Sequence, residues 1–166
     1  FYKPAQEKPL EFSIKSTTSE IQRTGCIVIG VFETRKLAAG ADSFDKESQQ
    51  FLAEILARGD MDGKAGTTLL LHNVPALTAE RAMLVGLGKE KGFHDKEYCA
   101  AIRTAVKVLK DTGARDATLH LTQIPVKKRN AAWRIRQAAM VASEVMYRFD
   151  RFKSTEEFAP ILTPLY

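Results

Sequence analysis

The segment Cys26–Phe32 (CIVIGVF) constrains the fold of this chain most, because its residues are almost all apolar and mainly β-branched or aromatic. A strand that is open to solvent on one face alternates apolar with polar residues. An uninterrupted apolar run is typical of a strand that is covered on both faces. We therefore expect Cys26–Phe32 to be an interior strand of an α/β protein, with helices on either side of its sheet.

The rest of the chain alternates strand-like and helix-like patterns. Four more segments have the composition of strands: Glu11–Ser16, Thr67–Asn73, Ala82–Gly86 and Ala117–Leu121. Three segments have helical spacing: Asp42–Arg58, the stretch from a predicted N-cap at Asp95 to Gly113, and Asn130 to about Phe149. The order β-β-α-β-β-α-β-α predicts a three-layer α/β/α sandwich around a mixed sheet.

The apolar runs also predict the core. We expect both Cys26–Phe32 and Thr67–Asn73 to be interior strands, and Ile27, Val28, Ile29, Leu69 and Leu70 to be largely buried. Replacing Ile29 or Leu70 with alanine should then cost about 2–5 kcal/mol, because the change leaves a cavity.

Length and composition exclude several classes of protein. A chain of 166 residues is about the size of one domain, and it has no apolar run long enough to span a membrane. Two cysteines, Cys26 and Cys99, cannot supply a disulfide framework or a four-thiolate zinc site. A reduced, cytoplasmic setting is the simplest expectation.

No catalytic constellation emerges from the histidines and cysteines. His72, His94 and His120 lie far apart and match no metal-binding spacing, so structural roles are favoured over ligation. Cys26 opens a buried strand and Cys99 falls within a predicted helix, so both are expected to be small core residues.

The glycines and aspartates do not complete a known loop either. Gly59 and Gly63 stand one residue too close for a phosphate-binding P-loop. Gly86 and Gly88 follow a strand as in a dinucleotide loop, but the third glycine is replaced by Lys91. Asp60 and Asp62 are not followed by the ligands of a calcium loop.

The positive charge is concentrated in one part of the chain. The net charge is +5, yet between positions 101 and 140 nine basic residues face only Asp111 and Asp116. The nine are Arg103, Lys107, Lys110, Arg115, Lys127, Lys128, Arg129, Arg134 and Arg136. Such asymmetry favours an acidic partner, most commonly nucleic acid. The alternative is that these side chains are simply the solvated faces of helices.

Within this basic segment, we expect Lys127, Lys128, Arg129 and Arg134 to form the nucleic-acid surface. In a helix that begins near Asn130, Arg136 is rotated about 200° from Arg134, so only one of them can join the other three. Trp133 and Gln137 flank a different side of the helix from Arg136, so we expect Arg134 to be the arginine that joins the surface.

Several collinear segments of the chain resemble the N-terminal domain of bacterial leucyl aminopeptidases, the cytosol aminopeptidase or aminopeptidase A family. They are CIVIGVFE (26–33), ILARGDMDGKAG (55–66), TLLLHNVP (68–75), ERAMLVGLGKEK (80–91), KDTGA (110–114) and WRIRQA (133–138). The resemblance covers residues 10–153 and implies a macro-domain-like fold with about six strands. Residues 1–9 are then a flexible leader or an expression remnant. We expect residues 154–166 to be a truncated linker towards a catalytic domain.

The resemblance also implies a function. In this family a following C-terminal domain binds two divalent metals, zinc or manganese, through a set that includes an Asn-Thr-Asp-x-Glu-Gly-Arg signature. That string is absent here. We therefore expect no catalytic, cofactor-binding or metal-binding residues in this chain, which on its own should be inactive. The parent enzyme is expected to be a hexameric metalloprotease that removes N-terminal amino acids from peptides.

Three roles for the domain itself remain open. It can serve assembly with its own catalytic domain and access to the active site, and this role follows from the resemblance. It can bind DNA through the basic segment, as some bacterial members of the family do. It can bind an ADP-ribose-like nucleotide at a strand-end loop such as Val85–Lys89, which fold analogy alone supports.

Overall fold

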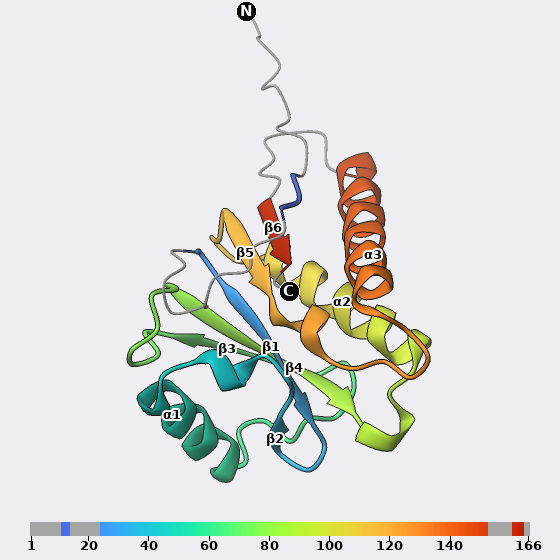
Figure 1. The fold of residues 1–166 in the computed structure, drawn as a ribbon. Helices are drawn as coiled ribbons and strands as arrows, with labels where there is room; N and C mark the ends of the chain where they lie inside the picture. Colours follow the sequence, from blue (N-terminus) through green and yellow to red (C-terminus); the bar gives the residue numbers. More distant parts are fainter. Residues whose placement is uncertain (1–10, 14–23, 153–160, 165–166) are drawn as a thin grey trace, which may run out of the picture.

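The computed structural model describes residues 11–13, 24–152 and 161–164 and has an α/β fold. Its mixed six-stranded sheet has the order β3-β4-β1-β5-β6, and β2 pairs with β1 beside this path (Figure 1). The strands are β1 (Ile27–Phe32), β2 (Lys36–Leu37), β3 (Thr68–His72), β4 (Arg81–Gly88), β5 (Asp116–Leu119) and β6 (Ile161–Pro164). The α-helices are α1 (Lys46–Ala57), α2 (Asp95–Lys110) and α3 (Ala131–Phe152), and the 3₁₀ helices are η1 (Ala41–Ser43), η2 (Glu90–Gly92) and η3 (His120–Gln123).

Strand β1 is the interior strand that its apolar run predicts. It pairs in parallel with β4 on one side and with β5 on the other. Ile27, Ile29 and Val31 belong to the core on one face of the sheet, and Val28 belongs to the core on the opposite face. All four side chains are fully buried. The uninterrupted run is therefore explained by two cores that share one strand.

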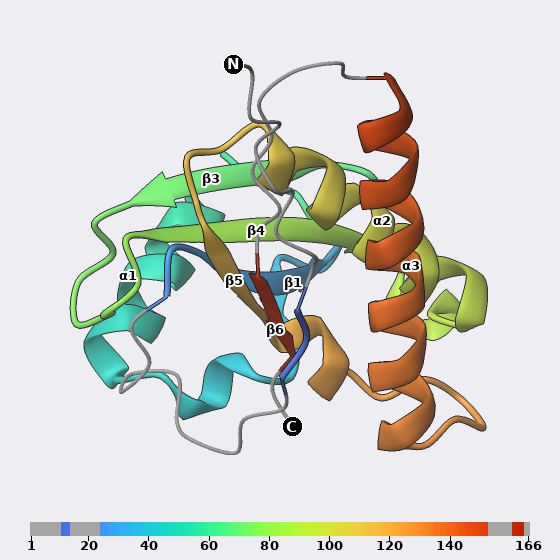
Figure 2. The same ribbon diagram turned by 90° about the horizontal axis from the view of Figure 1, so that it is seen from above.

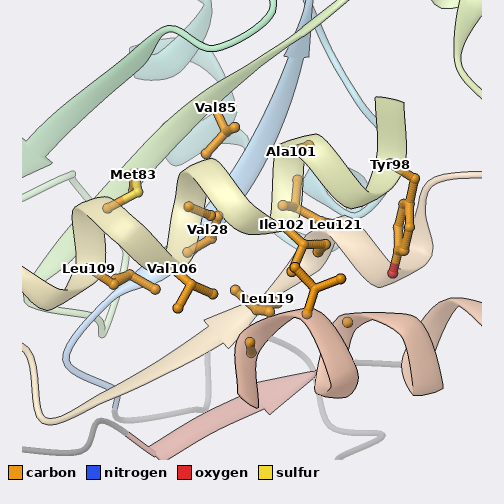
Figure 3. Close-up of a cluster of buried hydrophobic side chains, with 14 of the residues drawn as sticks. Val28, Met83, Val85, Tyr98, Ala101, Ile102, Val106, Leu109, Leu119 and Leu121 are labelled. Atoms are coloured by element: carbon orange, nitrogen blue, oxygen red, sulfur yellow. The ribbon is translucent and has the colours of Figure 1, made fainter. Parts of the chain in front are cut away.

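Helices cover both faces of the sheet, which confirms the predicted sandwich (Figure 2). On one face, Leu52 and Leu56 of α1 pack with the odd-numbered residues of β1. On the other face, α2 and α3 pack against the sheet and against each other. Figure 3 shows this second core, in which Ile102 and Val106 of α2 lie against Val28.

The prediction that Thr67–Asn73 is an interior strand is wrong. Among the described strands, β3 lies at the edge of the sheet and pairs only with β4, in antiparallel register. Leu69 and Leu70 are half-buried rather than buried, although each packs against one of the two cores. An apolar run reports that both faces of a strand are covered, but it carries no information on whether both edges are paired.

Helix starts differ from the predicted ones by up to four residues, because α1 begins at Lys46 and not at Asp42. The N-cap of α2 is His94 rather than Asp95, and the backbone N–H of His94 donates to the side chain of Glu97 at 3.1 Å. Asn130 caps α3, because its side-chain oxygen accepts a hydrogen bond from the backbone N–H of Trp133 at 2.8 Å. The sequence therefore located the start of α3 correctly and that of α2 to within one residue.

Both ends of the chain were predicted to lie outside the folded domain. Residues 161–164 form β6, which pairs in parallel with β5, so this part of the predicted linker 154–166 is a strand of the sheet. The predicted leader 1–9 lies outside the described residues, as does most of the predicted strand Glu11–Ser16. No described helix has the length and apolar character that a membrane-spanning segment requires.

Candidate functional site

Exposed cations of the basic segment gather around one open hollow of the surface. Lys127, Lys128 and Arg129 line one side of it, and Lys96 in the first turn of α2 lines the other. The buried side chain of Val126 anchors the segment, and the backbone N–H of Arg129 donates to the Val126 carbonyl at 3.0 Å. This turn brings three consecutive cations to the same hollow.

Arg129 differs from the lysines because two partners hold its side chain. Its guanidinium forms an ion pair with Asp95, with Nη2 2.6 Å and Nε 3.0 Å from Oδ2. It also lies over the ring of Trp133, 4.7 Å from the centroid. The hydrogen bond from Arg129 is the main cause that lowers the pKa of Asp95. Asp95 thus offsets the charge of Arg129, and the lysines carry the net positive charge.

Arg134, which sequence reasoning placed in the same surface, is not among the residues that line the hollow. Its side chain is half-buried, and its Nε is buried without a hydrogen-bond partner among the described residues. Its carbonyl accepts a hydrogen bond from the hydroxyl of Tyr98 at 2.7 Å, and burial raises the pKa of that hydroxyl. Arg134 therefore belongs to the contact between α2 and α3 more than to the cationic surface.

Sequence reasoning missed the residues that α2 contributes to the hollow. His94, Asp95 and Lys96 lie more than 30 positions before the basic run, and they reach it only because α2 packs against α3. Asp95 was expected to cap a helix, whereas its carboxylate is the partner of Arg129. In the sequence, the charged residues at the start of this helix were a local sign that it contributes to a charged surface.

The glycines of β4 do not form a phosphate-binding loop. The segment Val85–Lys89 was expected to be a loop, but Gly86 and Gly88 lie within the strand. The N–H of Gly86 donates to the Thr67 carbonyl at 2.8 Å, and that of Gly88 to the Gly63 carbonyl at 2.9 Å. A Cβ on Gly86 would overlap the carbonyl oxygen of Lys64. These glycines let the chain at 63–67 approach the strand, and the N–H groups of Gly86 and Gly88 that a phosphate would need already donate to carbonyls of that segment.

A second hollow lies near the carboxyl ends of the parallel strands, where ligands of open α/β sheets usually bind. Phe32, Phe93 and Ile124 provide apolar parts of its lining. Its charged lining residues are Lys36 and the two carboxylates Asp42 and Glu90. An excess of carboxylates disfavours the phosphates of a nucleotide.

One histidine and one cysteine, His120 and Cys26, are buried in the core. His120 is fully buried, neither ring nitrogen has a hydrogen-bond partner among the described residues, and burial lowers its pKa to about 4. Burial raises the pKa of Cys26 to about 12. Within the described part of the chain, no three His, Cys, Asp or Glu side chains are grouped so that they could hold a metal ion.

Known proteins resemble this chain over most of its length. The family model for the N-terminal domain of the cytosol aminopeptidase family matches residues 28–156. The probable cytosol aminopeptidase of Dechloromonas aromatica is 57% identical over 148 residues, which are 89% of this chain and 30% of that protein. Its counterpart in Nitrosospira multiformis is 51% identical over 150 residues, or 90% and 29%. The chain thus spans about 30% of the length of these relatives.

Solved structures agree on the fold. A tomato leucine aminopeptidase variant superposes with a TM-score of 0.68 at 19% identity, over 99% of this chain and 34% of that one. The macrodomain of Mycobacterium tuberculosis DarG superposes with a TM-score of 0.64 at 9% identity, over 95% and 98%. The second likeness confirms the macro-like fold, and the family match goes further: the chain belongs to the cytosol aminopeptidase family and comprises that family's N-terminal domain.

Proposed function

We propose that this chain is the non-catalytic N-terminal domain of a cytoplasmic, metal-dependent aminopeptidase that removes N-terminal amino acids from peptides. The observation that carries the proposal is the combination of 57% identity with coverage of only 30% of a cytosol aminopeptidase. The remaining 70% of such a relative has room for a catalytic domain. A related structure, the bottromycin maturation enzyme BotP, is described in complex with Mn, which supports metal dependence. In this proposal the catalytic domain binds two divalent ions, manganese or zinc.

The domain's own role in this proposal is assembly and access to the active site. It packs on its own C-terminal catalytic domain within a homo-hexamer. Two separate cores, one on each face of the sheet, support this role, because they make a rigid body that can position a neighbour.

The test compares the 166-residue chain with the full-length protein from the same gene. The full-length protein should release leucine from a leucyl amide in the presence of manganese or zinc. The chain alone should not, because a two-metal site needs ligands that it lacks. Metal-dependent turnover by the purified chain would overturn the proposal.

We propose DNA as a second partner, because Lys96, Lys127, Lys128 and Arg129 line one hollow, and Asp95 is the one carboxylate among its described lining residues. A few lysine–phosphate contacts give binding that is independent of sequence, with a dissociation constant of about 10⁻⁴ to 10⁻⁶ M. A hexamer would present several copies of the hollow and gain avidity without new contacts.

A DNA titration at two salt concentrations tests this second role. The K127A/K128A/R129A variant should bind more weakly, and its salt slope should flatten by about 0.9 for each phosphate contact removed. The K36A/K46A/R58A variant removes the same charge from exposed residues elsewhere and should keep the slope. Equal slopes for both variants, or no binding at low salt, would show that the basic segment is a solvated face.

A further inference from the structure

Strand β3 presents a row of main-chain groups that β4 does not use. In its antiparallel register with β4, Thr67 lies opposite Gly86 and Asn73 opposite Glu80. The N–H of Gly86 donates to Thr67 and the N–H of Asn73 to Glu80. Inward and outward bonding alternate along an antiparallel strand, so the N–H and C=O groups of Thr68, Leu70 and His72 point away from β4.

This outward edge lacks the features that usually prevent strands from pairing. Charged side chains, proline and bulges protect most exposed edges. The segment Thr68–His72 reads TLLLH, without a lysine, a glutamate or a proline, and its register with β4 is regular. Figure 2 shows β3 along the border of the sheet, beyond β4. Its leucines are only half-buried.

We propose that β3 pairs with β3 of a second copy of this chain, antiparallel and about a two-fold axis at Leu70. In this register the outward groups of Leu70 meet those of the same residue in the other copy, and position 68 faces position 72. Each outward N–H then finds a carbonyl, and the two sheets become one. The inference does not depend on the aminopeptidase function.

The composition of the strand fits a copy of itself. No residue from 68 to 72 carries a formal charge with histidine neutral, so the two-fold arrangement opposes no like charges. Leu69 and Leu71 pack towards the core of α1 and Leu70 towards the core of α2. A two-fold pair would continue both apolar layers across the new interface, as isologous contacts do.

Charge changes at positions 68 and 72 test the register. In the T68K/H72K variant, two lysine pairs face each other across the axis, so the dissociation constant of the dimer should rise on the order of tenfold. In the T68E/H72K variant, each glutamate faces a lysine and dimerisation should be kept. The Q50K/A53K variant adds the same two charges at exposed positions of α1 and serves as the control.

Sedimentation over a range of concentrations measures association, and hydrogen exchange locates it. The amides of Thr68, Leu70 and His72 should exchange fast in the monomer and slowly in the dimer. The amides of Leu69 and Leu71 should be protected in both. A purely monomeric chain, or a dimer in which these variants and amides do not respond, would overturn the proposal. Thermal unfolding by circular dichroism verifies that each variant is folded.

Discussion

The carboxylate of Asp95 and the guanidinium of Arg129, 34 residues apart in the sequence, meet in a bidentate ion pair. The pair joins the first turn of α2 to the segment that precedes α3. Both side chains remain partly exposed, so the pair is a weak source of stability. Its larger effect is electrostatic, because it places one negative charge inside a group of cations.

Replacing Asp95 with asparagine should therefore strengthen DNA binding. The D95N change removes the opposing charge and leaves Arg129 free to contact a phosphate, which steepens the salt slope by up to about 0.9. A fluorescence titration of a DNA duplex at two salt concentrations measures both effects. Asp62, which pairs with Lys64 at 3.5 Å, provides the control, and D62N should leave binding unchanged. Weaker binding by D95N would contradict the assignment of this hollow.

Truncating Ile29 should destabilise the chain much more than truncating Leu70. Ile29 is fully buried in β1, so I29A should cost about 2–5 kcal/mol in free energy of unfolding. Leu70 is half-buried on the edge strand, and L70A should fall below that range, contrary to the value expected from the sequence. Urea unfolding of both variants gives the comparison. Equal losses would mean that β3 is as enclosed as β1.

Adding one methyl group at Gly86 should also destabilise the fold. The new Cβ would overlap the Lys64 carbonyl, which is backbone and cannot rotate away, so G86A should cost about 1–3 kcal/mol or more. Gly92 has no atom within 4 Å of a Cβ placed on it, and G92A is the matched control with little expected effect. Thermal unfolding of the two variants measures the difference. Equal unfolding temperatures would contradict a tight contact between Gly86 and residues 63–67.

The buried ring of His120 should make stability depend on pH. Burial lowers its pKa to about 4, against about 6.5 in the unfolded chain. Below pH 6.5 the unfolded state therefore binds the proton first, and the free energy of unfolding falls as the pH drops to about 4. The loss from this residue is on the order of 3 kcal/mol in total, and its contribution is constant above pH 6.5.

The H120L variant isolates this contribution. Its free energy of unfolding, measured in urea from pH 4 to 7.5, should fall less towards acid than that of the parent chain. The rings of Phe44 and His120 pack edge-to-face with their centroids 5.1 Å apart. The control variant F44L disturbs this contact but retains the titrating histidine. F44L should be less stable at every pH but keep the slope. An identical slope in H120L would show that another group titrates.

The residues that sequence reasoning placed correctly are those whose environment is decided by the chain's own pattern. Ile27, Val28 and Ile29 are buried because an apolar run on a strand needs cover on both faces. Asn130 begins a helix because its short side chain can accept the hydrogen bond of an orphan N–H. Such features depend on a few neighbouring residues.

The errors concern partners that lie far away in the sequence. The pattern of β3 resembles that of β1, yet only the strand order leaves β3 at an edge. Strand β6 was not predicted, because its segment contains a proline, which usually argues against a strand. Pro164 fits because it is the last residue of β6, where proline is tolerated. Only part of the hollow was predicted. Lys127 and Lys128 could be identified because they are adjacent in the chain, whereas Lys96 reaches them through the packing of α2 on α3.

The position of β1 in the sheet has a consequence for synthesis on the ribosome. Strand β1, the first of the described strands in chain order, lies between β4 and β5, and β5 in turn pairs with residues 161–164. Apart from the short pairing with β2, the edges of β1 stay open until β4 and β5 are translated, about 50 and 85 residues after Phe32, because these strands begin at Arg81 and Asp116. During that interval the nascent chain carries an almost wholly apolar segment whose edges are largely unpaired, a condition that favours aggregation over folding.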